Sequence, residues 1–445
     1  MNFLINKLFL FLSLNLFSQE KWTLDDCISF AFLNNLQIME ANFQHQIQAK
    51  ELKFQKNKRL PVLSATLNNS LSYGFQQMFS GEFIGQYKEI RSYRNDARIN
   101  ASVTLWNNNA QKINIQNQEI KLKTTLLTAQ QNKFELKLEI IAKYYSVLIA
   151  KERLQLAKNI FANREKFIKS KEKLFELGNI AKNELSEEKS NWIQDWQTYQ
   201  TEKINYKRAL FELAVLLQVP DKQHFEIIDN SNETLKKEIN LEELISLALS
   251  NSISVEIAKQ KVKLSENEIA NYKTQYFPKI TFDYSLGTSA QQIFDNQNLS
   301  FNEQFRNNLY QYGSVGLQIP VFNQGNTKTK IHQSKLKREL QKIKLAQEKQ
   351  DITNTVETLY FDIMAAKQNY AAATKTEKQT KEVYQFSAKL YEIGEINTFE
   401  FTGKKNEYVF SQLKKTQIKY ELLYKQKIIE SYIVESKNEN IPFTN

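Results

Sequence analysis

Apolar and polar residues follow a helical period over most of this chain. In 107–178 the apolar residues recur at steps of three and four, a spacing that predicts a coiled-coil helix. A second such stretch, 326–393, holds neither glycine nor proline over 68 residues and would be about 100 Å long as a helix. The seam of the first stretch comprises Phe134, Leu138, Ile141, Tyr145 and Leu148. A second seam beside it comprises Ile140, Tyr144 and Val147. Two seams on one helix predict neighbours on both sides, as in a ring of helices.

Four short stretches alternate with period two instead, which predicts β-strands with one apolar and one polar face. The expected strands lie at 63–75, 99–105, 280–287 and 315–321. Within each pair, the intervening residues are polar and are expected to form long connections; the first contains the charged run RSYRNDAR and the second is rich in Asn and Gln.

The second half of the chain repeats the first. TLDDCISFAFLNN at Thr23–Asn35 matches NLEELISLALSNS at Asn240–Ser252, and Pro61 matches Pro278, both at an offset of 217. We therefore predict a first repeat over 19–230 and a second over 231–445. Each contains a helix that pauses near its eleventh residue, two strands, a long helix and a return helix. The return helices are expected at 182–218 and 398–435, and the link between the repeats carries a possible strand at 225–228.

The first eighteen residues are typical of a secretory signal peptide. Lys7 supplies a positive charge before the apolar stretch Leu8–Phe17. A mainly apolar stretch of ten residues is too short to span a bilayer as a helix. The sequence therefore predicts export, with residues 1–18 removed.

Composition narrows the function further. The 445 residues carry a net charge of +11, but the lysines are dispersed among glutamates and match no nucleic-acid motif, so nucleic acid is not an expected partner. The single cysteine, Cys27, falls in an apolar helical pattern and is expected to be buried. The three histidines lack metal-ligand spacing, and no nucleotide-binding or nucleophile motif occurs. We therefore expect no metal, no cofactor and no enzyme activity.

Four amphipathic strands on an exported chain favour a transmembrane β-barrel. An open sheet edge cannot lie in lipid, and about eight strands are the practical minimum for closure. Two, three or four copies would supply 8, 12 or 16 strands. Three copies fit a lumen that continues into a ring of long helices.

Several motifs resemble the TolC family of outer-membrane efflux proteins: the two repeat openings, Pro61 and Pro278, WNNN and FNQG after the second strand of each repeat, and the turns LFELGNI (Leu174–Ile180) and LYEIGEI (Leu390–Ile396). The resemblance implies a mainly α fold with a β-barrel part. A homotrimer would form a 12-stranded barrel in the bacterial outer membrane and an α-barrel in the periplasm. The implied function is a passive exit duct for a tripartite efflux or type I secretion system. Its implied partners are a periplasmic adaptor (membrane fusion) protein, an inner-membrane transporter and outer-membrane lipid.

The resemblance also assigns roles to the two turns. Acids six residues after each turn glycine would line a gate, which selects Glu184 and Glu400; a second acid, Glu187, has Gly403 as its counterpart. The expected adaptor-contact tip comprises Leu174, Phe175, Leu177, Gly178, Leu390, Tyr391, Ile393 and Gly394. The competing interpretations are ordinary acids in a helix's first turn and simple packing between neighbouring helices.

One other function fits the helices and the signal. A secreted, soluble coiled-coil scaffold or binding protein explains both, although it leaves the four amphipathic strands without a purpose. Neither interpretation identifies an exported substrate, since drugs, secreted proteins and metal ions pass through similar ducts.

Overall fold

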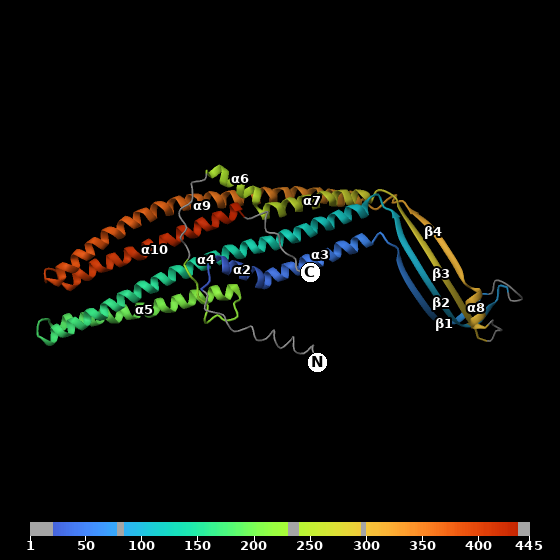
Figure 1. Ribbon diagram of the computed structural model, residues 1–445. Coiled ribbons are helices and arrows are strands. Elements are labelled where there is room, and N and C mark those ends of the chain that lie inside the picture. Colours follow the sequence, from blue (N-terminus) through green and yellow to red (C-terminus); the bar gives the residue numbers. More distant parts are fainter. Residues whose placement is uncertain (1–20, 78–83, 230–239, 295–299, 435–445) are drawn as a thin grey trace, which may run out of the picture. The chain divides into compact units, whose positions relative to one another are not determined.

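The computed structural model describes residues 21–77, 84–229, 240–294 and 300–434, and the expected signal peptide lies outside them. The described chain is mostly helical with one antiparallel sheet (Figure 1). In its first half the elements are α2 (Leu24–Asn34), α3 (Leu36–Asn57), β1 (Val62–Gln77), β2 (Tyr87–Trp106), α4 (Ala110–Glu176) and α5 (Lys182–Leu217). In its second half they are α6 (Leu241–Asn251), α7 (Ile253–Thr274), β3 (Lys279–Ile293), α8 (Phe301–Asn307), β4 (Tyr310–Gln318), α9 (Asn326–Glu392) and α10 (Thr398–Val434).

Both halves follow the predicted order, with α8 as an addition in the second. The long helices α4 and α9 each contain 67 residues. The pause expected near the eleventh helical residue is confirmed, because α6 ends at Asn251 and α7 begins at Ile253. Thr23 starts α2 with a capping box, in which its hydroxyl accepts from the Asp26 N–H and the Asp26 carboxylate accepts from the Thr23 N–H. The boundary expected between the repeats, 230/231, lies outside the described residues.

By their internal contacts the residues group into two compact units, each with segments from both halves. The first unit comprises Met1–Phe43, Leu126–Ile257 and Ala346–Asn445. The second comprises Gln44–Thr125 and Ala258–Leu345 and holds the sheet.

The first unit consists of paired antiparallel helices. α4 and α5 lie side by side, as do α9 and α10 (Figure 1). The main apolar core joins α4, α5 and α2, with Ile140, Leu213 and Cys27 all fully buried. Burial raises the pKa of the Cys27 thiol to about 12, so this cysteine is an inert core residue, as expected.

The link after α5 is held against this core. Trp22 and Ile227 form a single parallel bridge within the segment 225–228, where the sequence suggests a strand. The Tyr420 hydroxyl donates to the Asp229 carboxylate at 2.8 Å, and Tyr144 donates to the Ile228 carbonyl. These bonds connect the linker to α4 and to α10.

The sheet has the order β1-β2-β3-β4 with antiparallel pairing throughout. Its strands correct one expectation: β2 begins at Tyr87 instead of residue 99, so RSYRNDAR is part of a strand. Arg94, Asp96 and Arg98 alternate with the residues of the other face and pair with small polar residues of β1, whereas Arg91 lies on the other face and pairs with Tyr73. Because this part of β2 is rich in charged residues, its alternation with period two is not evident from the sequence.

The second connection was also predicted wrongly as irregular. β3 extends to Ile293, and α8 follows at 301–307, started by a capping box between Ser300 and Glu303. α8 covers the part of the β3 edge that the shorter β4 leaves unpaired. There Gln304 Oε1 accepts the Gln291 N–H at 2.9 Å, and Asn308 Nδ2 donates to the Ser289 carbonyl at 2.7 Å. The side chains of this Asn/Gln-rich segment thus replace a strand partner.

Candidate functional site

Two tight turns, at Gly178 and Gly394, join each long helix to its return helix. Both glycines have left-handed φ angles, +75° and +81°. The residue after each glycine donates its N–H back to the carbonyl of Leu174 (2.8 Å) or Leu390 (2.9 Å). This helix ending needs a left-handed residue, so a side chain at either position would be strained.

The predicted adaptor-contact residues divide into exposed and half-buried groups. Leu177 and Ile393 expose 73% and 69% of their surface, and Phe175 exposes 38%. Phe399, in the first turn of α10, exposes 82% and was not predicted. The half-buried members are Leu174, Leu390 and Tyr391. The tip therefore presents large apolar side chains from both turns.

Glu184, a predicted gate residue, is engaged in a bridge between the two helix pairs. Its carboxylate accepts from Lys171 Nζ of α4 at 2.8 Å and from the Thr398 hydroxyl of α10 at 3.5 Å. The Lys171 ammonium also lies 4.9 Å from the centre of the Tyr391 ring. Burial lowers the pKa of Lys171, but the bonds to Glu184 and Tyr391 outweigh it and the pKa is raised.

The other two predicted gate acids are exposed. Glu187 lies on the outer side of α5. Glu400 is in the first turn of α10, where its own N–H donates to Asn397 Oδ1 at 2.9 Å. The structure thus places Glu184 in an ion pair and leaves Glu187 and Glu400 exposed.

A buried charge cluster near the tip was missed by the sequence analysis. Arg164 of α4 is 5% exposed and donates to Glu188 at 2.8 Å and to Asp195 at 2.9 Å, both on α5. Glu188 is fully buried, and burial raises the pKa of its carboxyl despite the adjacent guanidinium. The available signal was helical spacing, since Glu188 lies one turn after Glu184 on the face that also buries Leu185.

The pKa of Lys405 on α10 is affected by the same cluster. Burial, together with the charge of Arg164, lowers the pKa of Lys405 to about 8. The carboxylates of Asp195 and Glu188 act in the opposite direction. The ammonium of Lys405 is therefore less stable at this site than in water.

Aromatic rings extend the connection along the α9/α10 pair. Tyr391 stacks on Phe401 with centroids 4.8 Å apart, and Phe401 stacks on Tyr384 at 6.0 Å. Phe167 of α4 lies 5.7 Å from Tyr391. The tip is thus held by one aromatic stack and two charge clusters.

The sheet places most of its large apolar side chains on one face, which also carries the paired Asn69 and Asn95 and, at one end, Arg91 and Glu89. Directly paired residues lie on the same face, and one face combines Leu63, Leu67 and Leu71 with Ile99, Val103, Leu286, Phe282, Val315 and Leu317. Leu67 exposes 79% of its surface and Leu71 exposes 74%. The opposite face carries small polar residues with hydrogen bonds across strands, among them Ser102 to Asp283 at 2.6 Å. In the described strands, β1 and β4 are each paired along one edge.

Comparisons with known proteins agree with this architecture. Residues 244–429 match the family described as "Outer membrane efflux protein". Over this stretch, which is less than half of the chain, the sequence is similar to that family. The matched range begins in α6 and ends in α10, so it covers nearly all of the second repeat.

One curated relative and two solved structures are also similar. The chain is 21% identical to "Toxin and drug export protein A" of Aggregatibacter actinomycetemcomitans over 69% of its own length and 66% of that protein, just under two thirds. The Campylobacter jejuni CmeC outer membrane channel aligns with a TM-score of 0.74, 15% identity and coverage of 92% and 85%. VceC of Vibrio cholerae aligns with a TM-score of 0.78, 10% identity and coverage of 93% and 96%. The fold is therefore similar to that of these two outer membrane proteins.

None of the described helices has both the length and the apolarity needed to cross a membrane. Among the same residues, no group of three or more His, Cys, Asp or Glu side chains could hold a metal ion.

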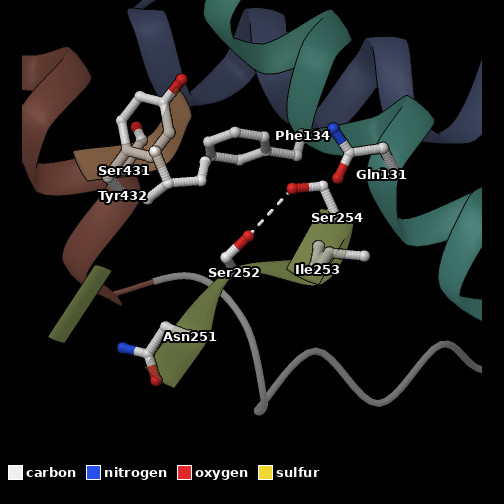
Figure 2. A pocket seen from close by; sticks show the side chains of 9 residues that line it. Gln131, Phe134, Asn251, Ser252, Ile253, Ser254, Ser431 and Tyr432 are labelled. Carbon is white, nitrogen blue, oxygen red and sulfur yellow. Dashed lines mark hydrogen bonds between the residues drawn. The ribbon is translucent and has the colours of Figure 1, made fainter. Parts of the chain in front are cut away.

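A small hollow lies beside the break between α6 and α7, and the residues that line it connect this break to neighbouring helices. It has a volume of about 70 Å³, and Figure 2 shows Ser252 and Ser254 hydrogen-bonded to each other at its edge, at 3.0 Å. Asn251 Nδ2 donates to the Ile433 carbonyl, and Phe134 packs edge-on against Tyr432. These contacts hold the break against α4 and α10.

Proposed function

We propose that three copies of this protein assemble into a passive outer-membrane exit duct. The observation that carries the proposal is the four-stranded sheet, which exposes one apolar face and has an available edge on β1 and on β4. An exposed face of this kind fits lipid, and lipid requires that both edges be paired. Three copies would close a 12-stranded barrel with its polar faces inward.

The length of the apolar face supports a membrane location. It runs along β1 from Leu63 to Phe75, which at about 3.3 Å per residue is about 40 Å of strand. It is interrupted by the Asn69–Asn95 pair and bordered at its end by Arg91 and Glu89. With the tilt of about 40° usual for barrels, the face would span about 30 Å, close to the hydrocarbon thickness of a bilayer. Tyr73, Tyr93 and Phe75 gather at one end of the face and Trp106 stands near the other, as expected of aromatic girdles.

The tip contacts support a closed resting state. Lys171, Glu184 and Thr398 tie the α4/α5 pair to α10, and the contact of Phe167 with Tyr391 ties α4 to α9. We infer that these ties must break for the helix pairs to separate. An adaptor that binds the exposed Leu177, Ile393 and Phe399 would supply the free energy for this opening.

Transport in one direction requires energy, which partner proteins would supply. An inner-membrane transporter would supply the energy, and an adaptor would couple it to the duct. A role in export agrees with the printed name of the curated relative, a toxin and drug export protein.

The mass of the assembly tests the proposal most directly. We expect native mass spectrometry of the mature protein, extracted from outer membranes with detergent, to give three copies. A monomer that dissolves in plain buffer would contradict the proposal, because its four strands could not then reside in lipid.

Gate variants test the tip. We expect Lys171→Ala and Glu184→Ala to raise single-channel conductance several-fold in planar bilayers, because each removes the ion pair that joins α4 to α5 and the bridge toward α10. Glu400→Ala should reduce cation selectivity, since a ring of carboxylates attracts cations.

The control is Lys169→Ala, which removes an exposed lysine of α4 whose ion pair with Glu165 is 3.6 Å long. This change should leave conductance unaltered. If all three gate variants conduct like the parent protein with the same selectivity, the gate assignment is wrong and the duct itself is unaffected.

A further inference from the structure

An open, positively charged hollow lies where the helices of the first repeat meet the sheet. It has a volume of about 470 Å³ and lies between the end of α3, the end of β2 and the start of α4. Three cations line it, Lys58, Arg59 and Lys112, and its described lining contains no Asp or Glu. A hollow with three cations and no carboxylate favours an anionic ligand.

The backbone explains why the cations converge. After α3, the N–H of Arg59 bonds to the Lys56 carbonyl and that of Leu60 bonds to the Asn57 carbonyl, so the helix ends in a tight turn before Pro61. Lys58 and Arg59 are presented side by side by this turn. Between β2 and α4, Asn108 and Asn109 adopt left-handed φ angles of 49° and 63°, which start α4 abruptly and place Lys112 in its first turn.

The same hollow has an apolar wall. Trp106, Leu105 and Val103 line it, and Trp106 exposes 42% of its surface. These residues form the end of β2, next to the apolar sheet face. The ligand should therefore combine an anionic group with a hydrocarbon part.

The second repeat supplies a natural comparison. At its junction Gln324 and Gly325 adopt the same left-handed turn, with φ angles of 56° and 75°. In the aligned positions, however, Gln275 and Tyr276 replace Lys58 and Arg59, and Lys328 alone matches Lys112. Thr327 is fully buried there and bonds to Asn323 and Gln275. The turn geometry therefore does not require the cations.

We propose that Lys58, Arg59 and Lys112 bind the headgroup of an anionic phospholipid, with Trp106 and Leu105 against its glycerol and acyl portion. This inference rests on the proposed function, which places the helix–sheet junction at the membrane surface. Basic and aromatic side chains at that level suit a phosphodiester beside a hydrocarbon chain. The bound lipid would fix the depth of each protomer in the membrane.

Native mass spectrometry can test the site in the intact assembly. Detergent-extracted protein is mixed with palmitoyl-oleoyl phosphatidylglycerol or with the zwitterionic phosphatidylethanolamine of the same chains. We expect preferential retention of phosphatidylglycerol, and a loss of about tenfold or more in the variant Lys58→Gln/Arg59→Gln/Lys112→Gln. The matched control, Lys328→Gln/Lys335→Gln/Lys337→Gln, removes the same charge from α9 and should retain the lipid within about twofold of the parent.

The outcomes separate the possible explanations. Equal retention of the two lipids, or an equal loss in both triple variants, would overturn the site. Full displacement of phosphatidylglycerol by an equal concentration of inorganic phosphate would also overturn it, because the apolar wall would then contribute nothing. A parent protein that is not trimeric would contradict the proposed function, whereas a trimer without lipid preference would contradict only this inference.

Discussion

Leu67→Arg is expected to abolish accumulation of the protein in the outer membrane. Leu67 lies in the middle of β1 on the apolar face and exposes 79% of its surface. An arginine facing lipid at the middle of a barrel strand costs about 2–4 kcal/mol, and a trimer would incur this cost three times. The measurement is the fraction of protein found in purified outer membranes by quantitative immunoblotting.

Asn68→Arg is the matched control, because the neighbouring residue points to the polar face opposite Asp96. We expect this variant to assemble normally. The pair also discriminates against a soluble scaffold, in which an arginine at either exposed position would be tolerated. Normal membrane accumulation of Leu67→Arg would therefore contradict the barrel.

Arg164→Met is expected to destabilise the tip end of the α4/α5 pair by about 3–5 kcal/mol per protomer. The change leaves Glu188 fully buried without its cation, and one oxygen of that carboxylate already has no hydrogen-bond partner among the described residues. Part of the cost would be offset if the carboxyl took up a proton. Denaturant unfolding followed by helical circular dichroism would report the loss.

Two further variants distinguish the effect of burying an unpaired carboxylate from the effect of losing a positive charge. Lys169→Met removes an exposed lysine of the same helix and should cost about 0.5 kcal/mol or less. Arg164→Met/Glu188→Leu should recover most of the stability, because it replaces the buried pair by apolar packing and leaves only the partly exposed Asp195. Equal small losses for Arg164→Met and Lys169→Met would show that the buried pair contributes little.

The elements that the sequence predicted well are those whose pattern is local. The long helices end at Gly178 and Gly394 because a left-handed residue is needed there, and a run without glycine or proline is visible without any structure. The start of β2 and the helix α8 were missed for a different reason. Arg94, Asp96 and Arg98 occupy one face of a strand whose partner is known only from the fold, and α8 covers an edge that exists only because β4 is short.

The candidate site shows the same division. Resemblance selected Glu184 and Glu400 from their distance to the turn glycines. It did not indicate that Glu184 pairs with Lys171, or that Arg164 and Glu188 form a buried pair, because those partners are 13 and 24 residues apart and meet only when α4 and α5 pack.

For this protein, the sequence by itself determined the duplication, the long helices, the glycine turns and the presence of four amphipathic strands. Each of these follows from spacing along the chain, which sets which residues share a face. The tertiary structure decided the strand order and register, which charges are buried in pairs, and where three cations meet Trp106. Those features depend on which distant segments pack together. Because both repeats carry the same order of elements, that order alone does not identify which segments pack against each other.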